Sequence, residues 1–371
     1  MLELVVEHRA GIPVLMQPLS GNSHDGKAFG QVIRDHIAQL HPTTNPTYLV
    51  ADSALYSAEN LPKLAETSLK WSTRVPATLT EAQEVLGQAN PQTMAPLTEG
   101  YRYHVVPSSY GGVAQRWVLI YSEPRQPQAQ RTVDKQWRKQ SDHEVKAFQT
   151  LCRTAFACEA DAHQALARFV HALQTTFLYE STVYPTPHYG KRGRPGPGAP
   201  PAQLVYHIAG ALASRLTDRQ ARVDQQSCFI LATNELDEGQ LSPQAVLDGY
   251  KGQARAERGF RFLKDPQFLA SSLYLKKPER IMALLMVMTV CLLVYAALEY
   301  RIRTALKDTE VTFPDQKGRR IQNPTARWVF HYFVGIHVLY IPGQGLMVLN
   351  LTDEHWHLLE LLGKRYAWFY R

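Results

Sequence analysis

The sequence predicts an α/β fold, in which a mixed sheet is flanked by helices and interrupted by a large inserted subdomain of helices and strands. Short apolar runs typical of strands alternate with helical patterns near both ends of the chain. Between them, residues 87–223 change to long strand-like runs, long helical stretches and a linker rich in proline and glycine. A chain of 371 residues is long enough to bury a core and carry such an insertion.

The composition is that of a folded, basic protein. Hydrophobic residues make up 45% and charged residues 20% of the chain, which argues against wholesale disorder, collagen-like repeats and coiled coil. Lys and Arg number 40 against 33 Asp and Glu, and the net charge of +7 favours a polyanionic partner, nucleic acid above all. Four cysteines are too few for a disulfide framework, and the N-terminus lacks the features of a signal peptide. We therefore expect a cytoplasmic protein.

The first part of the expected core, residues 1–86, ends one of its strands in an acidic residue. The apolar run at 48–51 is followed directly by Asp52. Functional groups collect at the carboxyl ends of strands in open α/β sheets, so Asp52 is a candidate site residue. The expected elements are strands at 2–7 and 12–18, a helix at 27–40, a strand at 48–51, a helix after the following turn, a strand at 70–75, and a loop and helix at 76–86.

The insertion, residues 87–223, starts with two strand-like runs joined by Gly111-Gly112, a pair suited to a hairpin turn. Helices are expected over 130–173. The segment 184–203 is so rich in proline and glycine that neither helix nor strand is expected to persist in it.

This linker also carries a basic segment. Arg192 and Arg194 lie in an RGRP sequence, and an extended basic segment of this kind can enter an A·T-rich minor groove. The alternative interpretation is a solvated linker without a partner.

The second part of the core, residues 224–310, contains a segment apolar enough to cross a membrane. Residues 281–298 carry no charge, and their length is close to what a bilayer-spanning helix needs. Arg280 and Glu299 bracket the run, and a charged helical sequence continues after it. We therefore expect a helix buried in a soluble core, with no membrane partner. A strand at 227–233 and a helix at 242–264 precede it, and a C-terminal helical region at 311–371 ends in an amphipathic helix.

The helix expected at 242–264 has one polar face. At about 100° per residue, its polar side chains fall within a stripe of about 80°. A surface ladder of ion pairs is the alternative explanation of this pattern. The residues of the stripe are Tyr250, Gln253, Glu257, Arg261 and Lys264.

Glu257 and Asp52 could converge at one edge of the sheet. Carboxylate oxygens suit hard cations such as Mg²⁺ or Mn²⁺, and a pair of these metals can activate water and stabilise the leaving 3′ oxygen in phosphodiester chemistry. The cationic residues around Glu257 would then hold the phosphates.

These residues resemble a known family, the DDE transposases of the insertion-sequence-four type, which have a ribonuclease-H-like core. The family motif is Tyr, two residues, Arg, three residues, Glu, six residues, Lys, and here it reads Tyr250, Gln253, Glu257 and Lys264, with Gln in place of Arg. Asp52, in the sequence ADSALYS, matches the second family aspartate. Other similar segments are GNSHD, STRVP, ILATN and PTARWVF.

The resemblance implies roles for these residues. Asp52 and Glu257, with a further aspartate, would hold two Mg²⁺ ions, and the complete enzyme would cleave the ends of an insertion element and join them to target DNA. Tyr250 and Lys264 would contact DNA ends and phosphates, and Gln253 would hydrogen-bond phosphate without a charge. Arg261 belongs to the same DNA-binding face. The partner is double-stranded DNA, both terminal repeats and target, and whether two copies form a homodimer is left open.

One departure bears on activity. In the family, the first catalytic aspartate lies on a strand before the hairpin that here spans residues 2–18. The resemblance therefore implies an N-terminally truncated transposase with two of three metal ligands and little or no activity. A non-catalytic DNA-binding remnant and a metal-dependent nuclease of another lineage are the alternatives.

Overall fold

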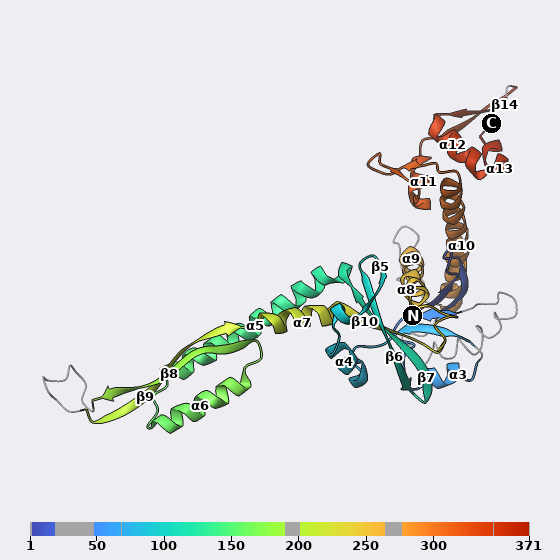
Figure 1. Cartoon of the computed structure of the whole chain (residues 1–371). Coiled ribbons are helices and arrows are strands. Elements are labelled where there is room, and N and C mark those ends of the chain that lie inside the picture. Colours follow the sequence, from blue (N-terminus) through green and yellow to red (C-terminus); the bar gives the residue numbers. More distant parts are fainter. Residues whose placement is uncertain are drawn as a thin grey trace. The chain divides into compact units, whose positions relative to one another are not determined.

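The computed structural model describes residues 2–18, 48–67, 69–189, 201–263, 277–343 and 345–370. The chain divides into two compact units, and Figure 1 traces the elements of each. Unit 1 comprises Met1–Thr73, Tyr110–Val113 and Ala245–Arg371, and unit 2 comprises Arg74–Ser109 and Ala114–Gln244.

Unit 1 begins with a hairpin of strands β1 (Leu2–Val6) and β2 (Pro13–Pro18), which pair antiparallel. Gly11, with φ of 72°, allows the tight connection, and the Glu7 carboxylate accepts the Ala10 N–H at 2.7 Å. The hairpin expected from the sequence is confirmed. The helix expected at 27–40 lies outside the described residues.

The next elements form a strand–helix–strand arrangement. Strand β3 (Leu49–Ala51) pairs in parallel with β4 (Trp71–Arg74), and helix α3 (Asn60–Ala65) lies between them in sequence. Trp71 on β4 is fully buried, as is Leu61 on α3. Both strands were expected, β3 from the apolar run at 48–51 and β4 from the strand expected at 70–75. In the six-stranded mixed sheet the strand order is β3-β4-β10-β7-β6-β5.

In unit 2, strand β10 (Cys228–Thr233) is buried along its whole length and pairs antiparallel with β7 (Val113–Ser122). Gly111 and Gly112 have φ of 61° and 76°, so the expected glycine turn before β7 is confirmed. The other elements here are helix α4 (Thr80–Gly87), strands β5 (Ala95–Thr98) and β6 (Tyr101–Tyr110), and the short 3₁₀ helices η2 (Pro91–Thr93) and η3 (Glu123–Arg125).

The rest of unit 2 is a two-stranded ribbon packed against helices. Strands β8 (Thr176–His188) and β9 (Gln203–Ser214) pair antiparallel along their length. Their core contains Phe148, Ala162, Leu166 and Ile208. The helices are α5 (Gln126–Arg153), α6 (Glu159–Ala172) and α7 (Leu216–Gln226).

This ribbon corrects one expectation. Strand β8 continues through Pro185 and Pro187 to His188, although the sequence of 184–203 predicted neither helix nor strand. A proline fits an edge strand, where the missing N–H can face away from the partner, and both strands of a two-stranded ribbon are edges. Residues 190–200, with Arg192 and Arg194, lie outside the described part of the chain.

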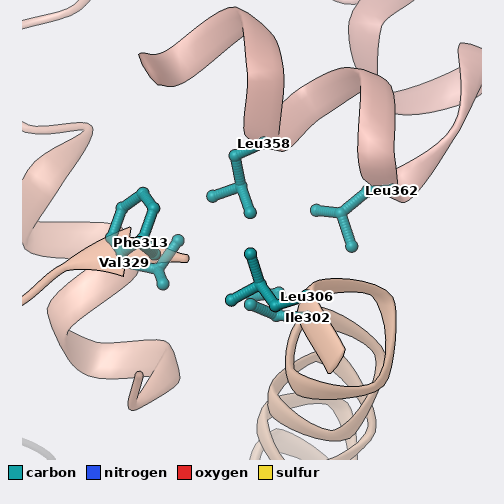
Figure 2. Close-up of a cluster of buried hydrophobic side chains, with 6 residues drawn as sticks. All are labelled: Ile302, Leu306, Phe313, Val329, Leu358 and Leu362. Carbon is teal, nitrogen blue, oxygen red and sulfur yellow. The ribbon is translucent and has the colours of Figure 1, made fainter. Parts of the chain in front are cut away.

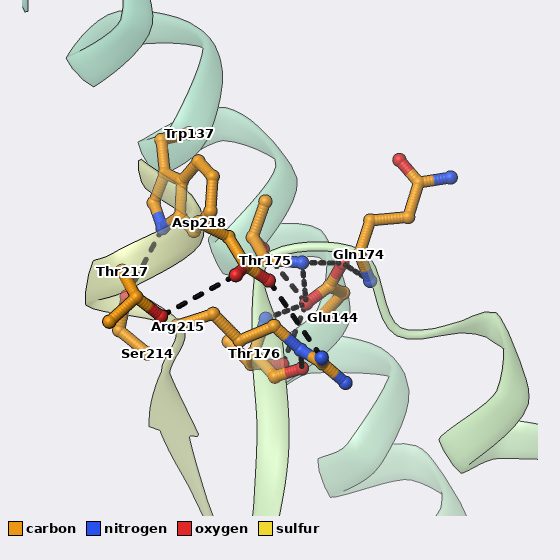
Figure 3. A network of polar contacts seen from close by, with 9 residues as sticks. All are labelled: Trp137, Glu144, Gln174, Thr175, Thr176, Ser214, Arg215, Thr217 and Asp218. Carbon is orange, nitrogen blue, oxygen red and sulfur yellow. Dashed lines mark hydrogen bonds and ion pairs between the residues drawn. The ribbon is translucent and has the colours of Figure 1, made fainter. Parts of the chain in front are cut away.

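A buried carboxylate on helix α5 is hydrogen-bonded to the start of strand β8 (Figure 3). Glu144 is 4% exposed and accepts hydrogen bonds from the backbone N–H groups and hydroxyls of Thr175 and Thr176. The Gln174 N–H and the Gln140 side-chain amide donate to it as well. Burial alone would raise the pKa of Glu144, but these hydrogen bonds outweigh burial and lower the pKa to about 2.

Back in unit 1, two helices occupy the segment expected to be one. Helix α8 (Pro243–Gly252) and helix α9 (Ala254–Leu263) are separated by a turn at Gln253. The expectation of a continuous helix over 242–264 is therefore wrong, and Tyr250 and Gln253 do not share one regular helical face with Glu257. Residues 264–276, with Lys264, lie outside the described part of the chain.

Helix α10 (Pro278–Asp308) also differs from its expectation. Only 11% of its most apolar 18-residue stretch is buried, and the side chains of Met286 and Val290 are 66% and 53% exposed. Within the described residues, Met288 and Leu292 pack against Leu263, whereas the other side of the helix is open. The expectation of a core helix is wrong for this stretch, because apolar composition does not by itself supply a packing partner. The helix is long and apolar enough to cross a membrane by length and composition.

The end of α10 anchors the C-terminal elements. Ile302 and Leu306 pack with Phe313, Val329 and the leucines of helix α12 (Asp353–Leu362; Figure 2). The expected C-terminal helix is in fact two helices that meet at Gly363, of which α12 buries its leucines whereas Trp368 and Phe369 are exposed. The described part of the region 311–371 also contains four short strands, so the expectation of a purely helical region is wrong. The C-terminal elements are β11 (Phe313–Pro314), β12 (Arg320–Ile321), α11 (Ala326–Tyr332), β13 (His337–Ile341), β14 (Gly345–Leu349), α12 (Asp353–Leu362) and α13 (Lys364–Trp368).

Candidate functional site

The first candidate residue, Asp52, directly follows strand β3 and is exposed. Its Oδ1 accepts the Ala54 N–H at 2.9 Å, and its backbone carbonyl accepts the Thr73 hydroxyl at 2.6 Å. The second bond ties the end of β3 to the neighbouring strand β4. Among the described residues, the second carboxylate oxygen, Oδ2, accepts no hydrogen bond, so it is accessible to a ligand.

The second candidate, Glu257, lies in the first turn of helix α9 and is exposed. Its backbone N–H donates to the Gln253 carbonyl at 3.1 Å. A carboxylate in the first turn is favoured by the partial positive charge of the helix N-terminus. In the described part of the chain its side chain makes no hydrogen bond or ion pair.

Three glycines let helices α8 and α9 approach the strands closely. A β-carbon at Gly249 would lie 3.4 Å from Val50 Cγ2 on β3. At Gly252 it would lie 2.6 Å from the His8 ring, and at Gly259 2.8 Å from a Leu4 methyl group on β1. The two helices thus pack against both β3, which leads to Asp52, and the hairpin. The sequence analysis missed these glycines, although glycine within a helical pattern indicates close packing.

The residues expected to bind DNA have different surroundings. Tyr250 is half-buried near the end of α8, and Arg261 is exposed in the last turn of α9. Gln253 lies in the turn between the helices, and its side-chain nitrogen is buried without a hydrogen-bond acceptor among the described residues. A buried donor without a partner is costly, so this amide is suited to a ligand oxygen.

Asp52 and Glu257 are each exposed carboxylates, the ligand type that a hard divalent cation such as Mg²⁺ prefers. Within the described ranges, no group of three or more His, Cys, Asp or Glu residues could hold a metal ion.

A family model described as the transposase DDE domain matches residues 1–294. The match covers more than half of the chain, and the chain belongs to the transposase DDE domain family. Membership implies a transposase, an enzyme whose partner is DNA. No curated protein and no solved structure matches the chain.

Proposed function

We propose that the chain is a DNA transposase similar to the insertion-sequence-four type, acting on double-stranded DNA at terminal repeats and target sites. The family match over residues 1–294 carries this proposal. It is supported by the position of Asp52 after β3 and of Glu257 on a helix whose neighbour packs against that strand. The sheet and its flanking helices are compatible with a ribonuclease-H-like core. Strands β5, β6 and β7 belong to this sheet although they fall within the insertion expected at 87–223, so only the part of that segment after β7 is proposed as an insertion.

In this proposal Asp52 and Glu257 are the catalytic carboxylates and hold Mg²⁺ or Mn²⁺. The ions, when bound, would activate a water or 3′ hydroxyl and stabilise the leaving oxygen. The two side chains contribute negatively charged oxygens that face solvent and are therefore not neutralised by the protein itself.

The neighbouring residues would hold DNA. Tyr250 and Gln253 lie on the N-terminal side of Glu257, and the unsatisfied amide of Gln253 can donate to a phosphate oxygen. Arg261 supplies a charge for a second phosphate. Lys264, Arg192 and Arg194 complete the proposed set.

We expect weak catalysis from the two carboxylates. Among the described residues, no group of three or more His, Cys, Asp or Glu side chains could hold a metal ion. A site with fewer carboxylates has less negative charge and therefore binds the metal ion more weakly. DNA binding without cleavage would then be the residual activity, as in a transposase remnant.

Metal binding is the most direct test. We expect the full chain to bind Mn²⁺, measured by the electron paramagnetic resonance signal of the free ion, and Asp52→Asn or Glu257→Gln to weaken binding at least tenfold. Glu360→Gln, an exposed acid on α12, is the matched control and should bind as the wild type. Equal Mn²⁺ binding by all four proteins would refute the metal site.

The DNA products separate the alternatives. Strand-transfer products with Mg²⁺ or Mn²⁺ on a duplex carrying the terminal repeats indicate a transposase, and cleavage without joining indicates a nuclease. Binding without either product indicates a remnant. Sedimentation of the free chain and of its DNA complex would show whether a homodimer forms. We place this activity in the cytoplasm and not at a membrane.

A further inference from the structure

Unit 1 contains a cavity that the proposed catalytic residues do not explain. It has a volume of about 660 Å³ and lies between the turn of the β1–β2 hairpin, α9, the second half of α10 and the segment leading into α11. Seven cationic residues line it, against two acidic residues, Glu299 and Asp308. The cations that matter for the argument are Arg9, Arg255, Arg258, Arg303 and Lys307.

The cavity lies mostly on a different face of α9 from Glu257. Arg255, Arg258 and Phe262 line it and Glu257 does not, whereas Arg261, only about 40° from Glu257 on the helix, lines the cavity as well. At about 100° per residue, Arg258 is turned by about 100° from Glu257, and Phe262 by about 140°. A ligand in the cavity would therefore be distinct from a metal ion held by Glu257.

The positive charge of this cavity is incompletely neutralised. The Glu299 carboxylate forms ion pairs with the Arg303 guanidinium at 2.7 Å and the Arg258 guanidinium at 3.8 Å. It also accepts a hydrogen bond from the Ala326 N–H at 3.0 Å. One carboxylate thus serves two guanidinium groups. Burial, followed by the charges of Arg258 and Arg255, lowers the pKa of Arg303, against the opposite effect of Glu299. Among the described residues that line the cavity, seven cations face two acids, and an anion would relieve the repulsion between these cations.

The wall of the cavity is partly aromatic. Phe262 and Tyr295 are in contact, with ring centroids 5.0 Å apart, and Tyr300 is 41% exposed beside them. Apolar walls with charged groups at defined places are typical of pockets that bind small ligands or parts of larger ones. Arginine is also the side chain best suited to phosphate, because its planar guanidinium donates two parallel hydrogen bonds.

We propose that this cavity is a phosphate-binding site, separate from Asp52 and Glu257, that takes two or more neighbouring phosphate groups. The phosphates come from a DNA strand or from a free polyphosphate. Only the choice of DNA as a source rests on the proposed function. The volume of about 660 Å³ accommodates a few phosphate groups and lies within the range of ligand pockets, so the cavity takes neighbouring phosphates of one strand of a duplex.

The test compares two charge-matched double variants of the full chain. Arg258→Gln with Lys307→Gln removes two exposed cations from the cavity, and Lys364→Gln with Arg365→Gln removes two exposed cations from α13. Tripolyphosphate binding, measured by calorimetry, should weaken at least tenfold in the cavity variant and stay within twofold of the wild type in the control. Circular dichroism checks folding, and Arg9→Gln, on the exposed hairpin turn, is the second cavity variant if the first does not fold.

A DNA arm identifies the source of the phosphates. Fluorescence anisotropy of a labelled duplex is measured over a range of NaCl concentrations. Loss of two phosphate contacts should reduce the slope of log affinity against log salt by about 1.8, since each contact contributes about 0.9. A reduced slope, together with competition between tripolyphosphate and DNA, assigns the site to a DNA strand. An unchanged slope with weakened tripolyphosphate binding assigns it to a free polyphosphate.

The proposal is overturned if the cavity and control variants bind both anions equally. Mn²⁺ binding by the same proteins keeps this result separate from the catalytic proposal. If the wild type fails to bind Mn²⁺ but the cavity variant still loses phosphate affinity, the metal site is wrong and the phosphate site stands. If Mn²⁺ binds normally and phosphate affinity does not depend on the cavity residues, the metal site stands and the phosphate site is wrong.

Discussion

The Glu144 carboxylate offers the sharpest test of the energetics of unit 2. Its Oε1 and Oε2 together accept hydrogen bonds from six donor groups, which join α5 to the residues that begin β8. Glu144→Gln keeps the shape of the side chain but removes its charge. It also replaces one oxygen with an NH₂ group that faces donors, so at least two donors lose their acceptor.

The expected loss of stability follows from the pKa of Glu144. The hydrogen bonds lower the pKa of Glu144 from 4.5 to about 2, and at 1.36 kcal/mol per pKa unit this shift corresponds to about 3 kcal/mol of stability. Because the pKa is lower in the folded state, this contribution is complete above pH 4.5. It declines as the pH falls from 4.5 towards 2. At pH 7 we expect Glu144→Gln to cost about 3 to 4 kcal/mol, including the penalty for unsatisfied donors.

Hydrogen exchange is the appropriate assay, because a chain of two units need not unfold in one step. Backbone amides at Thr175 and Thr176, which donate to Glu144, should exchange over a hundredfold faster in the variant at pH 7. After correction for intrinsic rates, their protection in the wild type should fall between pH 4.5 and 2, and the variant should lose this pH dependence. Glu180→Gln, an exposed acid on β8, is the control. Protection equal to that of the control, or the same pH profile, would refute the reasoning.

Two further predictions concern packing in unit 1. Gly259→Ala should lower stability by about 1 to 3 kcal/mol despite a better helix propensity, because the new β-carbon would lie 2.8 Å from a Leu4 methyl group. At Gly87 an added β-carbon would have no atom within 4 Å, so Gly87→Ala should not lower the stability of the protein. A thermal unfolding temperature lower for Gly87→Ala than for Gly259→Ala would contradict the close packing of Gly259 on Leu4. Leu306→Ala, in the buried cluster at the end of α10, should cost about 2 to 5 kcal/mol in urea unfolding. Val290→Ala, on the exposed side of the same helix, should cost under about 1 kcal/mol; similar losses would show that this side is covered.

Much of the core could be predicted from local patterns. Strand β10 is a run of apolar residues, and the Gly111-Gly112 pair before β7 has the positive φ values that such a turn requires. These features depend on a few neighbouring residues. Strand β8 could not be predicted in the same way, because Pro185 and Pro187 forbid most strands and are tolerated only where the N–H side is unpaired. Whether a strand has an open edge depends on residues far away in the sequence.

The two errors on helices have the same origin. The apolar run in α10 has the composition of a core helix, but its burial depends on which residues pack against it. Met286 and Val290 are exposed, with no packing partner among the described residues that buries them. The break at Gln253 follows Gly252, where a β-carbon would require the exposed His8 ring to shift. Asp52 was identified from its place after a strand and Glu257 from the spacing of its motif, and the role of both in catalysis remains a prediction.

The glycines explain how packing positions the candidate site. A β-carbon at position 252 or 259 would lie within 3 Å of the His8 ring or of a Leu4 methyl group, whereas one at position 249 would make an ordinary contact with Val50. Glycine at 252 and 259 therefore lets α8 and α9 pack directly on the hairpin, and the turn at Gln253 lets each helix follow its own contact surface. Glu257 lies in the first turn of the second helix, directly after this break. A substitution at Gly252 should therefore displace Glu257 and weaken Mn²⁺ binding even though it removes no charge, whereas a change that affects stability alone would leave the affinity of the folded fraction unaltered.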